Sequence, residues 1–480
     1  MDEKVKNILN IFEHINAIPR CSGQEAELSK WIQNWAKENG FNVQTDKAGN
    51  LVVNVLPDKG YENAPAIVIQ GHMDMVCEKT PDYEHNFAKH PIVSVYDGDW
   101  LKAKGTSLGA DNGIAIAISM AIATDKSIGH PRLELLFTVE EETGLIGAAK
   151  LEPGFIKGKM LINLDSEDEG VFTIGCAGGI DSEITLPLEF SELPQTSRPF
   201  KIDVKGLCGG HSGIDIDKQR ANANKIIARA LHKIQLAFPT SILSVKGGSV
   251  GNAIPRDANA LIACDPIHFS GLENLVSEFE KTALNEFCMT EKSLSICIEH
   301  VAHNHKALSG LTSDTAKKAV NLLLAIPHGV TGMSADIQGK VETSNNLASI
   351  RIKDELLHIL TSQRSFTMSK LDEIAFRVKA IADLAGAHTK ASKQYPPWSP
   401  DTESVLLNRC IRTYKHLFHK EPVLESIHAG LECAVIGSKY PGIEMISLGP
   451  DIQNPHSPDE RMHIPSIKKI WDFLVALFQS

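Results

Sequence analysis

Imidazole and carboxylate side chains stand close to several short apolar runs of this sequence. Nitrogen and oxygen donors of this kind, with no sulfur among them, suit zinc, cobalt or manganese ions and disfavour a structural zinc site built from thiolates. Three adjacent carboxylates, at 140–142, repel one another unless water or a cation neutralises them. The set forms a candidate metal centre composed of His72, Asp74, Asp111, Glu140, Glu141, Glu142, Asp165 and His456.

Each member of the set also has a simpler structural explanation. His72 and Asp74 could be a hydrogen-bonded pair at a strand end, and Asp111 could cap the helix that follows it. The run at 140–142 could be a solvated turn, and His456 a surface histidine. The set as a whole favours a metal centre, because its members are predicted to gather at the ends of neighbouring strands, where open α/β sheets bind ligands.

The elements that would position these side chains alternate between strands and helices. Continuous apolar runs predict central strands that are covered on both faces, and Ile114, Ile118 and Ile122 lie at helical intervals between two of the runs. Residues 1–177 and 391–480 therefore predict one discontinuous α/β domain, a mixed sheet flanked by helices. The predicted strands are at 65–70, 132–139, 159–164 and 443–450.

Residues 178–390 have a different pattern and predict an inserted α+β domain. Strand-like runs and helices alternate there in two successive stretches of similar order, with no obvious repeat of sequence. We interpret these stretches as a possible internal duplication. His300, His303 and His305 cluster in this segment, away from the carboxylates, and are predicted to lie on the surface.

Composition and charge exclude several classes of function. The chain has 480 residues, and 48 Lys and Arg against 59 Asp and Glu give a net charge of −11, the wrong sign for a nucleic-acid-binding surface. The amphipathic start is not a signal peptide, and the longest apolar run is too short to span a membrane. Nine scattered cysteines, none in Cys-x-x-Cys spacing, predict no disulfide framework. We expect a soluble cytoplasmic protein without nucleic-acid or membrane partners.

Five motifs follow one another along the chain: HMD (72–74), GADNG (109–113), EEETG (140–144), NLDSED (163–168) and NPHSPDE (454–460). In this order they resemble the di-zinc metallopeptidases of the aminoacylase and carboxypeptidase superfamily. Four further motifs are GGHSG (209–213), GGSVGNAIPR (247–256), SQRS (362–365) and HAGLEC (428–433). With them, the chain is most similar within that superfamily to the aminoacyl-histidine (Xaa-His) dipeptidases, or cytosolic non-specific dipeptidases. One departure from the wider superfamily is Met-Val after Asp74, where Val-Val-Pro is usual, and it bears on the loop rather than on the ligands.

The resemblance implies two divalent metal ions per chain, zinc in the first place and cobalt or manganese otherwise. His72 and Asp165 would hold one ion, and Glu142 and His456 the other. Asp111 and a water molecule would bridge the two ions. Paired cations of this kind lower the pKa of a shared water molecule and polarise the scissile carbonyl group.

The resemblance also assigns roles around the ions. Asp74 would orient the imidazole of His72, and Glu141 would be the general base that takes the proton of the water and delivers it to the leaving amine. The peptide bond between Asp111 and Asn112 would be cis, although a non-proline cis bond costs ~3–4 kcal/mol.

The segment at 178–390 would then be a lid and dimerisation domain of a homodimer. His211 would stabilise the oxyanion, within its own chain or across the dimer, and Asn252 and Arg364 would bind the free carboxylate of a dipeptide. The implied activity is hydrolysis of L-dipeptides with a preference for Xaa-His substrates. Taken without the resemblance, these three residues are better explained as a surface histidine, a turn asparagine and a solvated arginine.

Other functions stay open at this point. The nearest is another amidase of the same superfamily: a carboxypeptidase, an aminoacylase or a desuccinylase. The inserted segment of roughly 210 residues argues against these, because it is about twice what a simple dimerisation domain needs. A serine hydrolase and a non-catalytic binding protein on the same fold are the alternatives from other classes.

Overall fold

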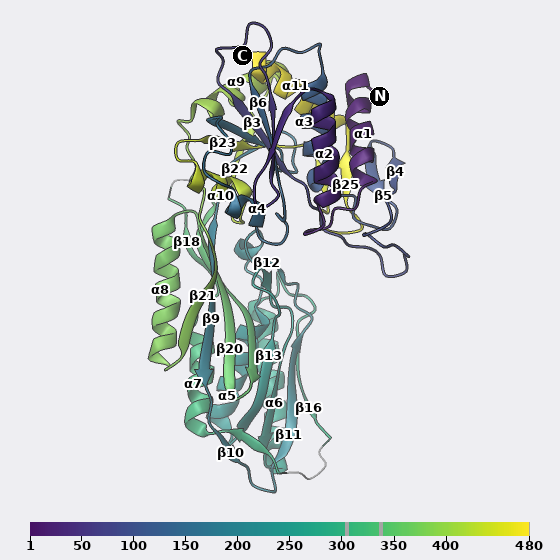
Figure 1. Ribbon diagram of the computed structural model, residues 1–480. Coiled ribbons are helices and arrows are strands. Elements are labelled where there is room, and N and C mark those ends of the chain that lie inside the picture. The colour runs from purple at the N-terminus through teal and green to yellow at the C-terminus, as the bar shows by residue number, and fades with distance from the viewer. Residues whose placement is uncertain (303–306, 336–338, 480) are drawn as a thin grey trace. The chain divides into compact units, whose positions relative to one another are not determined.

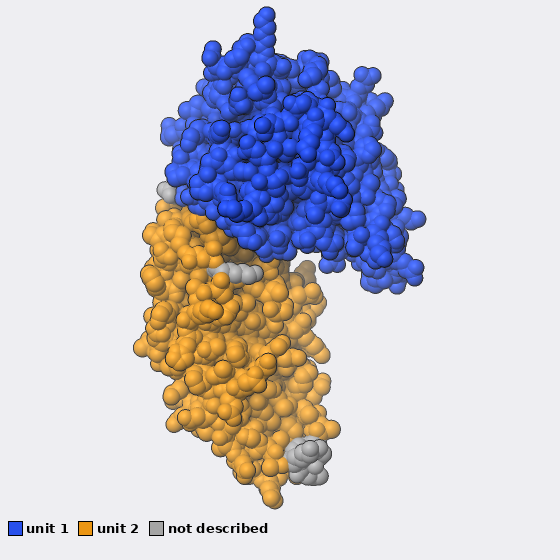
Figure 2. Space-filling model, in the orientation of Figure 1, with its two compact units in different colours: residues 1–176, 398–426, 431–480 blue, residues 177–397, 427–430 orange. Residues whose placement is uncertain are grey.

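The computed structural model describes residues 1–302, 307–335 and 339–479. Two of the three clustered histidines, His303 and His305, lie outside the described residues. The described residues form two compact units (Figure 2). Unit 1 comprises residues 1–176, 398–426 and 431–480, and unit 2 comprises residues 177–397 and 427–430.

The unit boundaries differ from the predicted ones at the return to unit 1. The chain was predicted to return to the first domain at residue 391. In the structure, unit 2 continues to Pro397 and also includes residues 427–430. The reason is a last strand at 388–395, which pairs with residues 179–185 of the same unit. The HAGLEC motif is thereby divided between the units, with residues 428–430 in unit 2 and 431–433 in unit 1.

Unit 1 is a mixed sheet flanked by helices, and the predicted α/β fold class is confirmed (Figure 1). Its helices are α1 (Glu3–Asn16), α2 (Ala26–Glu38), α3 (Ala110–Thr124), α4 (Ile146–Lys150), α9 (Val405–Phe418), α10 (Glu432–Lys439) and α11 (Ile464–Gln479). Its strands are β1 (Asn42–Thr45), β2 (Leu51–Val55), β3 (Ile67–His72), β4 (Ser94–Asp97), β5 (Trp100–Ala103), β6 (Leu133–Thr138), β7 (Met160–Asn163), β8 (Val171–Cys176), β22 (Val423–Ile427), β23 (Glu444–Ser447), β24 (Ile452–Gln453) and β25 (Arg461–His463).

The central strands of unit 1 run parallel, so that their carboxyl ends lie at one edge of the sheet. Among the described residues the strand order is β1-β2-β6-β3-β7-β23-β8-β22, and β6, β3, β7 and β23 are parallel to one another. Strands β3 and β6 are buried along their whole length, as their continuous apolar runs predict. Helix α3 packs between α1 and β3, and its small and β-branched residues are buried on nearly every side.

Unit 2 is built on one antiparallel sheet, in which the described strands have the order β16-β11-β15-β13-β19-β20-β9-β21. Its helices are α5 (Ala223–Ala237), α6 (Phe269–Glu286), α7 (Ser313–Ala325) and α8 (Met368–Leu384). Its strands are β9 (Gly178–Pro187), β10 (Phe190–Glu192), β11 (Arg198–Lys205), β12 (Gly210–His211), β13 (Ser241–Gly247), β14 (Ala253–Ile254), β15 (Ala258–Cys264), β16 (Ser295–His300), β17 (Ser309–Leu311), β18 (Gly329–Met333), β19 (Val341–Lys353), β20 (Leu356–Ser365) and β21 (His388–Tyr395).

The same succession of elements occurs twice in unit 2. One half is β11-α5-β13-β15-α6-β16, and the other is β9-α7-β19-β20-α8-β21. In each half the first strand lies between the third and the fourth, which gives both halves the same strand order in the sheet. The prediction that the two halves follow one another in the chain is wrong. Strand β9 belongs to the second half but precedes β11, the first strand of the other half.

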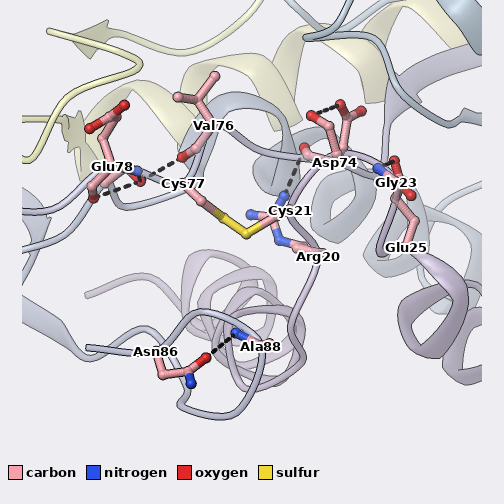
Figure 3. Close-up of a disulfide and its surroundings, with 12 residues drawn as sticks. Arg20, Cys21, Gly23, Glu25, Asp74, Val76, Cys77, Glu78, Asn86 and Ala88 are labelled. Carbon is pink, nitrogen blue, oxygen red and sulfur yellow. Dashed lines mark hydrogen bonds between the residues drawn. A yellow bond between two sulfur atoms is a disulfide. The ribbon is translucent and has the colours of Figure 1, made fainter.

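One disulfide, Cys21–Cys77, joins two segments of unit 1 (Figure 3), although the scattered cysteines predicted no disulfide framework. The two cysteines are 56 residues apart in the chain and meet because the backbone at Cys21 forms a parallel bridge with Met75. The other cysteines of the described chain are not in disulfides. As to membranes, none of the described helices combines the length and the apolar character that a span requires.

Candidate metal centre

The parallel strands of unit 1 bring the predicted ligands to one edge of the sheet. His72 is the last residue of β3. Residues 140–142 begin two positions after the end of β6, and Asp165 lies two positions after the end of β7. In the described chain, three groups of side chains have ligand atoms that all lie within 4.8 Å of one another. These groups are His72, Asp111 and Asp165; Asp111, Glu142 and His456; and His72, Glu141 and Glu142.

Asp111 lies between the first two groups, with one carboxylate oxygen toward each. Its Oδ1 is 3.0 Å from Nε2 of His72, and its Oδ2 is 3.0 Å from Nε2 of His456. Nε2 of His72 is also 3.4 Å from Oδ1 of Asp165, and Nε2 of His456 is 3.0 Å from Oε2 of Glu142. A carboxylate that faces two separate sets of donors is suited to bridging two cations.

The backbone at Asp111 is held in place by buried neighbours. The Asp111–Asn112 peptide bond is cis, so this prediction is confirmed. The side chain of Asn112 accepts a hydrogen bond from the His72 amide at 3.1 Å and donates one to the Leu164 carbonyl at 2.8 Å. This amide therefore fixes the start of α3 to the ends of β3 and β7.

Asp74 connects the imidazole to the loop that carries the adjacent glutamates. Its Oδ1 lies 3.3 Å from Nδ1 of His72, and its two oxygens accept hydrogen bonds from the backbone amides of Glu141 and Glu142 at 3.0 and 3.2 Å. The Ser22 hydroxyl donates to the same carboxylate at 2.7 Å. With Nδ1 held by Asp74, Nε2 of His72 is directed toward the other ligands.

Burial and crowding shift the pKa values of these groups strongly. Burial opposes a charge on His72, but the Asp165 carboxylate and hydrogen bonds to its acidic neighbours raise the pKa of His72 well above its ordinary value. Hydrogen bonds to Asp111 and Glu142 raise the pKa of His456 to about 11. Burial raises the pKa of Glu142, and it raises the pKa of Glu141 well above the ordinary range.

The residues present fit a pair of divalent cations. The donors are imidazole nitrogens and carboxylate oxygens, and Oε1 of Glu142 is buried without a hydrogen-bond partner in the described structure. A buried carboxylate oxygen without a donor is costly unless a cation compensates it. The same argument accounts for the raised pKa of the histidines, which supply positive charge to the carboxylates in the absence of a metal ion.

Metal uptake is expected to release protons, because the raised pKa of His456 favours its protonated form, which must lose a proton before Nε2 can bind an ion. Since the raised pKa favours the protonated form, the affinity for zinc should rise with pH and fall as the pH decreases. Calorimetry in two buffers of different protonation enthalpy measures the release. Equal heats in both buffers and an affinity that does not change between pH 6 and 8 would contradict this reading.

The three predicted residues of the inserted domain lie in unit 2. Nδ1 of His211 accepts hydrogen bonds from the backbone amides of Gly213 and Ile214 at 3.2 and 3.1 Å, which places the ring proton on Nε2. Asn252 precedes β14, whose pairing with β12 sets Ala253 opposite His211.

Arg364 is on β20, where it is almost fully buried, and it donates a hydrogen bond to the Tyr395 hydroxyl at 2.7 Å. Its Nε is buried and has no hydrogen-bond partner in the described structure. A buried arginine whose partner is a neutral hydroxyl is a candidate for binding an anion. The alternative that Arg364 is a solvated surface residue is therefore wrong.

His428 is the first residue of the HAGLEC motif, but nothing in the sequence indicated its role. Its Nε2 lies 2.8 Å from the Ser344 hydroxyl, and its carbonyl lies 2.0 Å from where a Cβ on Gly213 would stand. Burial lowers the pKa of His428 to about 3, and the positive charge of Arg364 acts in the same direction. His428 is thus a neutral imidazole beside the other candidate residues of unit 2.

Sequence reasoning also missed two residues that hold the loop of Asp111. Glu460 accepts hydrogen bonds from the backbone amides of Leu108, Gly109 and Asp111 at 2.7, 2.9 and 3.2 Å. Arg20 donates to the carbonyls of Met73 and Asp74 and to that of Gly109, and it stands beside the disulfide in Figure 3. Glu460 belongs to the NPHSPDE motif, which was a signal for it, whereas nothing near Arg20 in the sequence marks it.

Comparison with known proteins places these motifs in context. The family model for peptidase family M20/M25/M40 matches residues 68–480. The cytosol non-specific dipeptidase of Escherichia coli (strain K12) is 40% identical over 470 residues, which cover 98% of this chain and 96% of that protein.

Two solved structures are also similar. The aminoacylhistidine dipeptidase from Vibrio alginolyticus has a TM-score of 0.86 and 36% identity, over 98% of this chain and 96% of that one. A tripeptidase from Staphylococcus aureus has a TM-score of 0.56 and 16% identity, over 99% of this chain and 98% of that one. At this low identity, the likeness to the tripeptidase shows only that the two chains share a fold.

Proposed function

Because the chain belongs to peptidase family M20/M25/M40, we propose that it hydrolyses L-dipeptides, with a preference for a carboxy-terminal histidine, at a centre of two metal ions in unit 1. The observation that carries the proposal is the convergence of five side chains in two groups that share Asp111, with the ligand atoms of each group within 4.8 Å of one another. The first group is His72, Asp111 and Asp165, and the second is Asp111, Glu142 and His456. The two dipeptidase relatives, each similar over nearly the whole chain, support the substrate class.

The proposed ligand sets share Asp111. His72 and Asp165 would hold one ion, Glu142 and His456 the other, and Asp111 would contact both through its two oxygens. Two divalent cations at this place supply polarisation of the peptide carbonyl and a lowered pKa for a water molecule. We propose zinc, with cobalt or manganese as alternatives, because the donors are nitrogen and oxygen.

Glu141 is proposed as the general base. Its backbone amide is bound to Asp74, and its side chain belongs to the third ligand group, beside His72 and Glu142. The Glu141 carboxylate would take a proton from water as the water oxygen bonds to the carbonyl carbon. It would then pass this proton to the leaving nitrogen as the carbon–nitrogen bond breaks. Its raised pKa, caused first by burial, brings it closer to what proton transfer near neutral pH requires.

Unit 2 is proposed as a lid that recognises the dipeptide. The Nε2–H of His211 is a donor suited to an oxyanion, and His428 holds a neutral imidazole beside it. Asn252 and Arg364 would bind the free carboxylate, for which the planar guanidinium is well shaped. Residues 177–397 and 427–430 would also form the dimer interface of a homodimer.

We expect a substrate length limit at two residues, because Asn252 and Arg364 are proposed to hold the free carboxylate at a set distance from the metal ions. Arg364→Ala should raise the KM for dipeptides by about 10- to 100-fold, the effect expected for a charge-assisted hydrogen bond of ~1.5–3 kcal/mol. Arg377→Ala is the matched control, since this arginine is exposed on α8 and pairs only with Glu373. Steady-state rates on di-, tri- and tetrapeptides measure both points, and equal turnover of a tripeptide would refute the limit.

We propose a cytoplasmic location, in keeping with the cytosol relative and with the absence of a membrane-spanning helix among the described residues. The closest alternative is an amidase that acts on N-acylated amino acids. It predicts faster hydrolysis of N-acetyl amino acids than of dipeptides by the same purified enzyme.

A further inference from the structure

A layer of buried polar side chains lies beside or just before the candidate ligands on three parallel strands of unit 1. Gln70 precedes His72 by two residues on β3, and Asn163 precedes Asp165 by two residues at the end of β7. Thr138 is the last residue of β6 and is paired with His72. Since alternate residues of a strand point to the same face, Gln70 lies on the same face as His72. All three polar side chains are fully buried.

Hydrogen bonds join the layer across the strands. The Asn163 amide donates to Oε1 of Gln70 at 2.6 Å, which ties β7 to β3. The Gln70 amide donates to the Thr138 hydroxyl at 3.2 Å, which ties β3 to β6. These contacts lie immediately beneath the carboxyl ends that carry the candidate ligands.

Glu432, the first residue of α10, completes the layer from outside the sheet. Its Oε2 accepts hydrogen bonds from the Gln70 amide at 2.5 Å and from the Thr138 hydroxyl at 2.7 Å. Glu432 is fully buried, and its second oxygen, Oε1, has no hydrogen-bond partner in the described structure. A carboxylate in such a place is costly, and nearby cations of a metal centre would offset part of that cost.

We propose that Glu432 is a positioning residue, a buried acceptor that holds the ends of β3 and β6 at the separation that the metal centre requires. The inference rests on the proposed metal centre and adds a residue that touches neither metal nor substrate. Without this acceptor, the Thr138 hydroxyl could still donate to the Gly71 carbonyl, which lies 3.3 Å away. One N–H of the buried Gln70 amide would then have no acceptor, and we infer that the two strand ends would shift to supply one. Such a shift would move His72 relative to Glu142.

The test compares Glu432→Ala, Glu432→Gln and Thr138→Val with the unchanged protein. Zinc content is measured at graded free zinc concentrations, beside kcat, KM and the thermal midpoint of the metal-free protein. For Glu432→Ala we expect the half-saturating zinc concentration to rise about 10- to 100-fold, as for other residues that support metal ligands, while the KM for dipeptide changes less than about 2-fold. Glu432→Gln should restore most of the affinity, because its amide oxygen can accept the same two hydrogen bonds.

Glu134→Ala is the matched control for Glu432→Ala. Glu134 is equally buried on β6 and accepts two backbone hydrogen bonds, from Lys157 and Gly158, but it lies near the other end of the strand. This variant should lose stability without a change in zinc affinity.

Several outcomes would overturn the proposal. Glu432→Ala could lower the thermal midpoint as the control does while leaving zinc half-saturation unchanged, or Glu432→Gln could be as impaired as Glu432→Ala. If Glu432→Ala does not fold, Thr138→Val decides, because an unchanged zinc affinity there also refutes the role. A wild-type protein that binds no zinc would instead refute the proposed metal centre itself.

Discussion

Glu141→Gln is expected to keep two metal ions per chain and to lose about 10²- to 10⁴-fold in kcat, the usual contribution of a positioned base. The substitution removes the proton acceptor but leaves all five proposed ligands in place. Binding of a dipeptide should persist, because the base is not among the residues proposed to hold the substrate. Metal content by mass spectrometry and steady-state rates measure the two effects separately.

The neighbouring glutamates make this prediction specific. Glu142→Gln should lower metal occupancy toward one ion per chain, with partial rescue by added metal. The reason is that Glu142 belongs to one candidate ligand group, together with His456 and Asp111. Glu140→Gln is the control, because Glu140 belongs to none of the ligand groups of the described chain. All three carry the same charge, so an account based on charge alone would expect equal effects. Loss of a metal in Glu141→Gln and retention of both in Glu142→Gln would show that the motif has been read one residue out of register.

Asp111→Asn should reduce the occupancy of both metal sites together. Each carboxylate oxygen of Asp111 faces a different histidine, and an amide group cannot offer two anionic oxygens. The loss of activity should exceed the ~10²-fold that removal of a residue supporting a metal ligand typically costs. Metal analysis at fixed free zinc measures the occupancy, and kcat/KM for a dipeptide measures the consequence.

Asp125→Asn is the control for this prediction, because Asp125 caps the other end of α3 and pairs with Lys4. It should retain both ions and full activity. An Asp111→Asn variant that loses one ion and keeps the other firmly bound would argue that Asp111 belongs to a single site.

The grouping of the candidate ligands could be predicted from the sequence because each follows a strand or a loop with a local signal. The apolar runs that became β3, β6, β7 and β23 define where the strands end, and parallel pairing then brings those ends together. His72, residues 140–142 and Asp165 are therefore adjacent in space for a reason that is visible in the chain.

The residues that support the ligands could not be predicted in this way. Glu432 meets Gln70 across 362 positions of the chain, and Glu460 meets Leu108 across 352, so no local pattern relates the partners. Arg20 and Cys21 likewise contact the segment after His72 from a distant part of the chain, Arg20 at the Asp74 carbonyl and Cys21 through its disulfide with Cys77. The assignment of β9 to the second half of unit 2 was missed for the same reason, since its partners β20 and β21 lie far along the chain.

The most direct test of the account is a titration of the metal-free protein with zinc, in which hydrolysis of an Xaa-His dipeptide and bound metal are measured in the same samples. The account predicts no hydrolysis without metal, a rise that is complete at two ions per chain, and no inhibition by serine-acylating reagents. Full activity in the metal-free protein would contradict it, as would inactivation by an acylated serine.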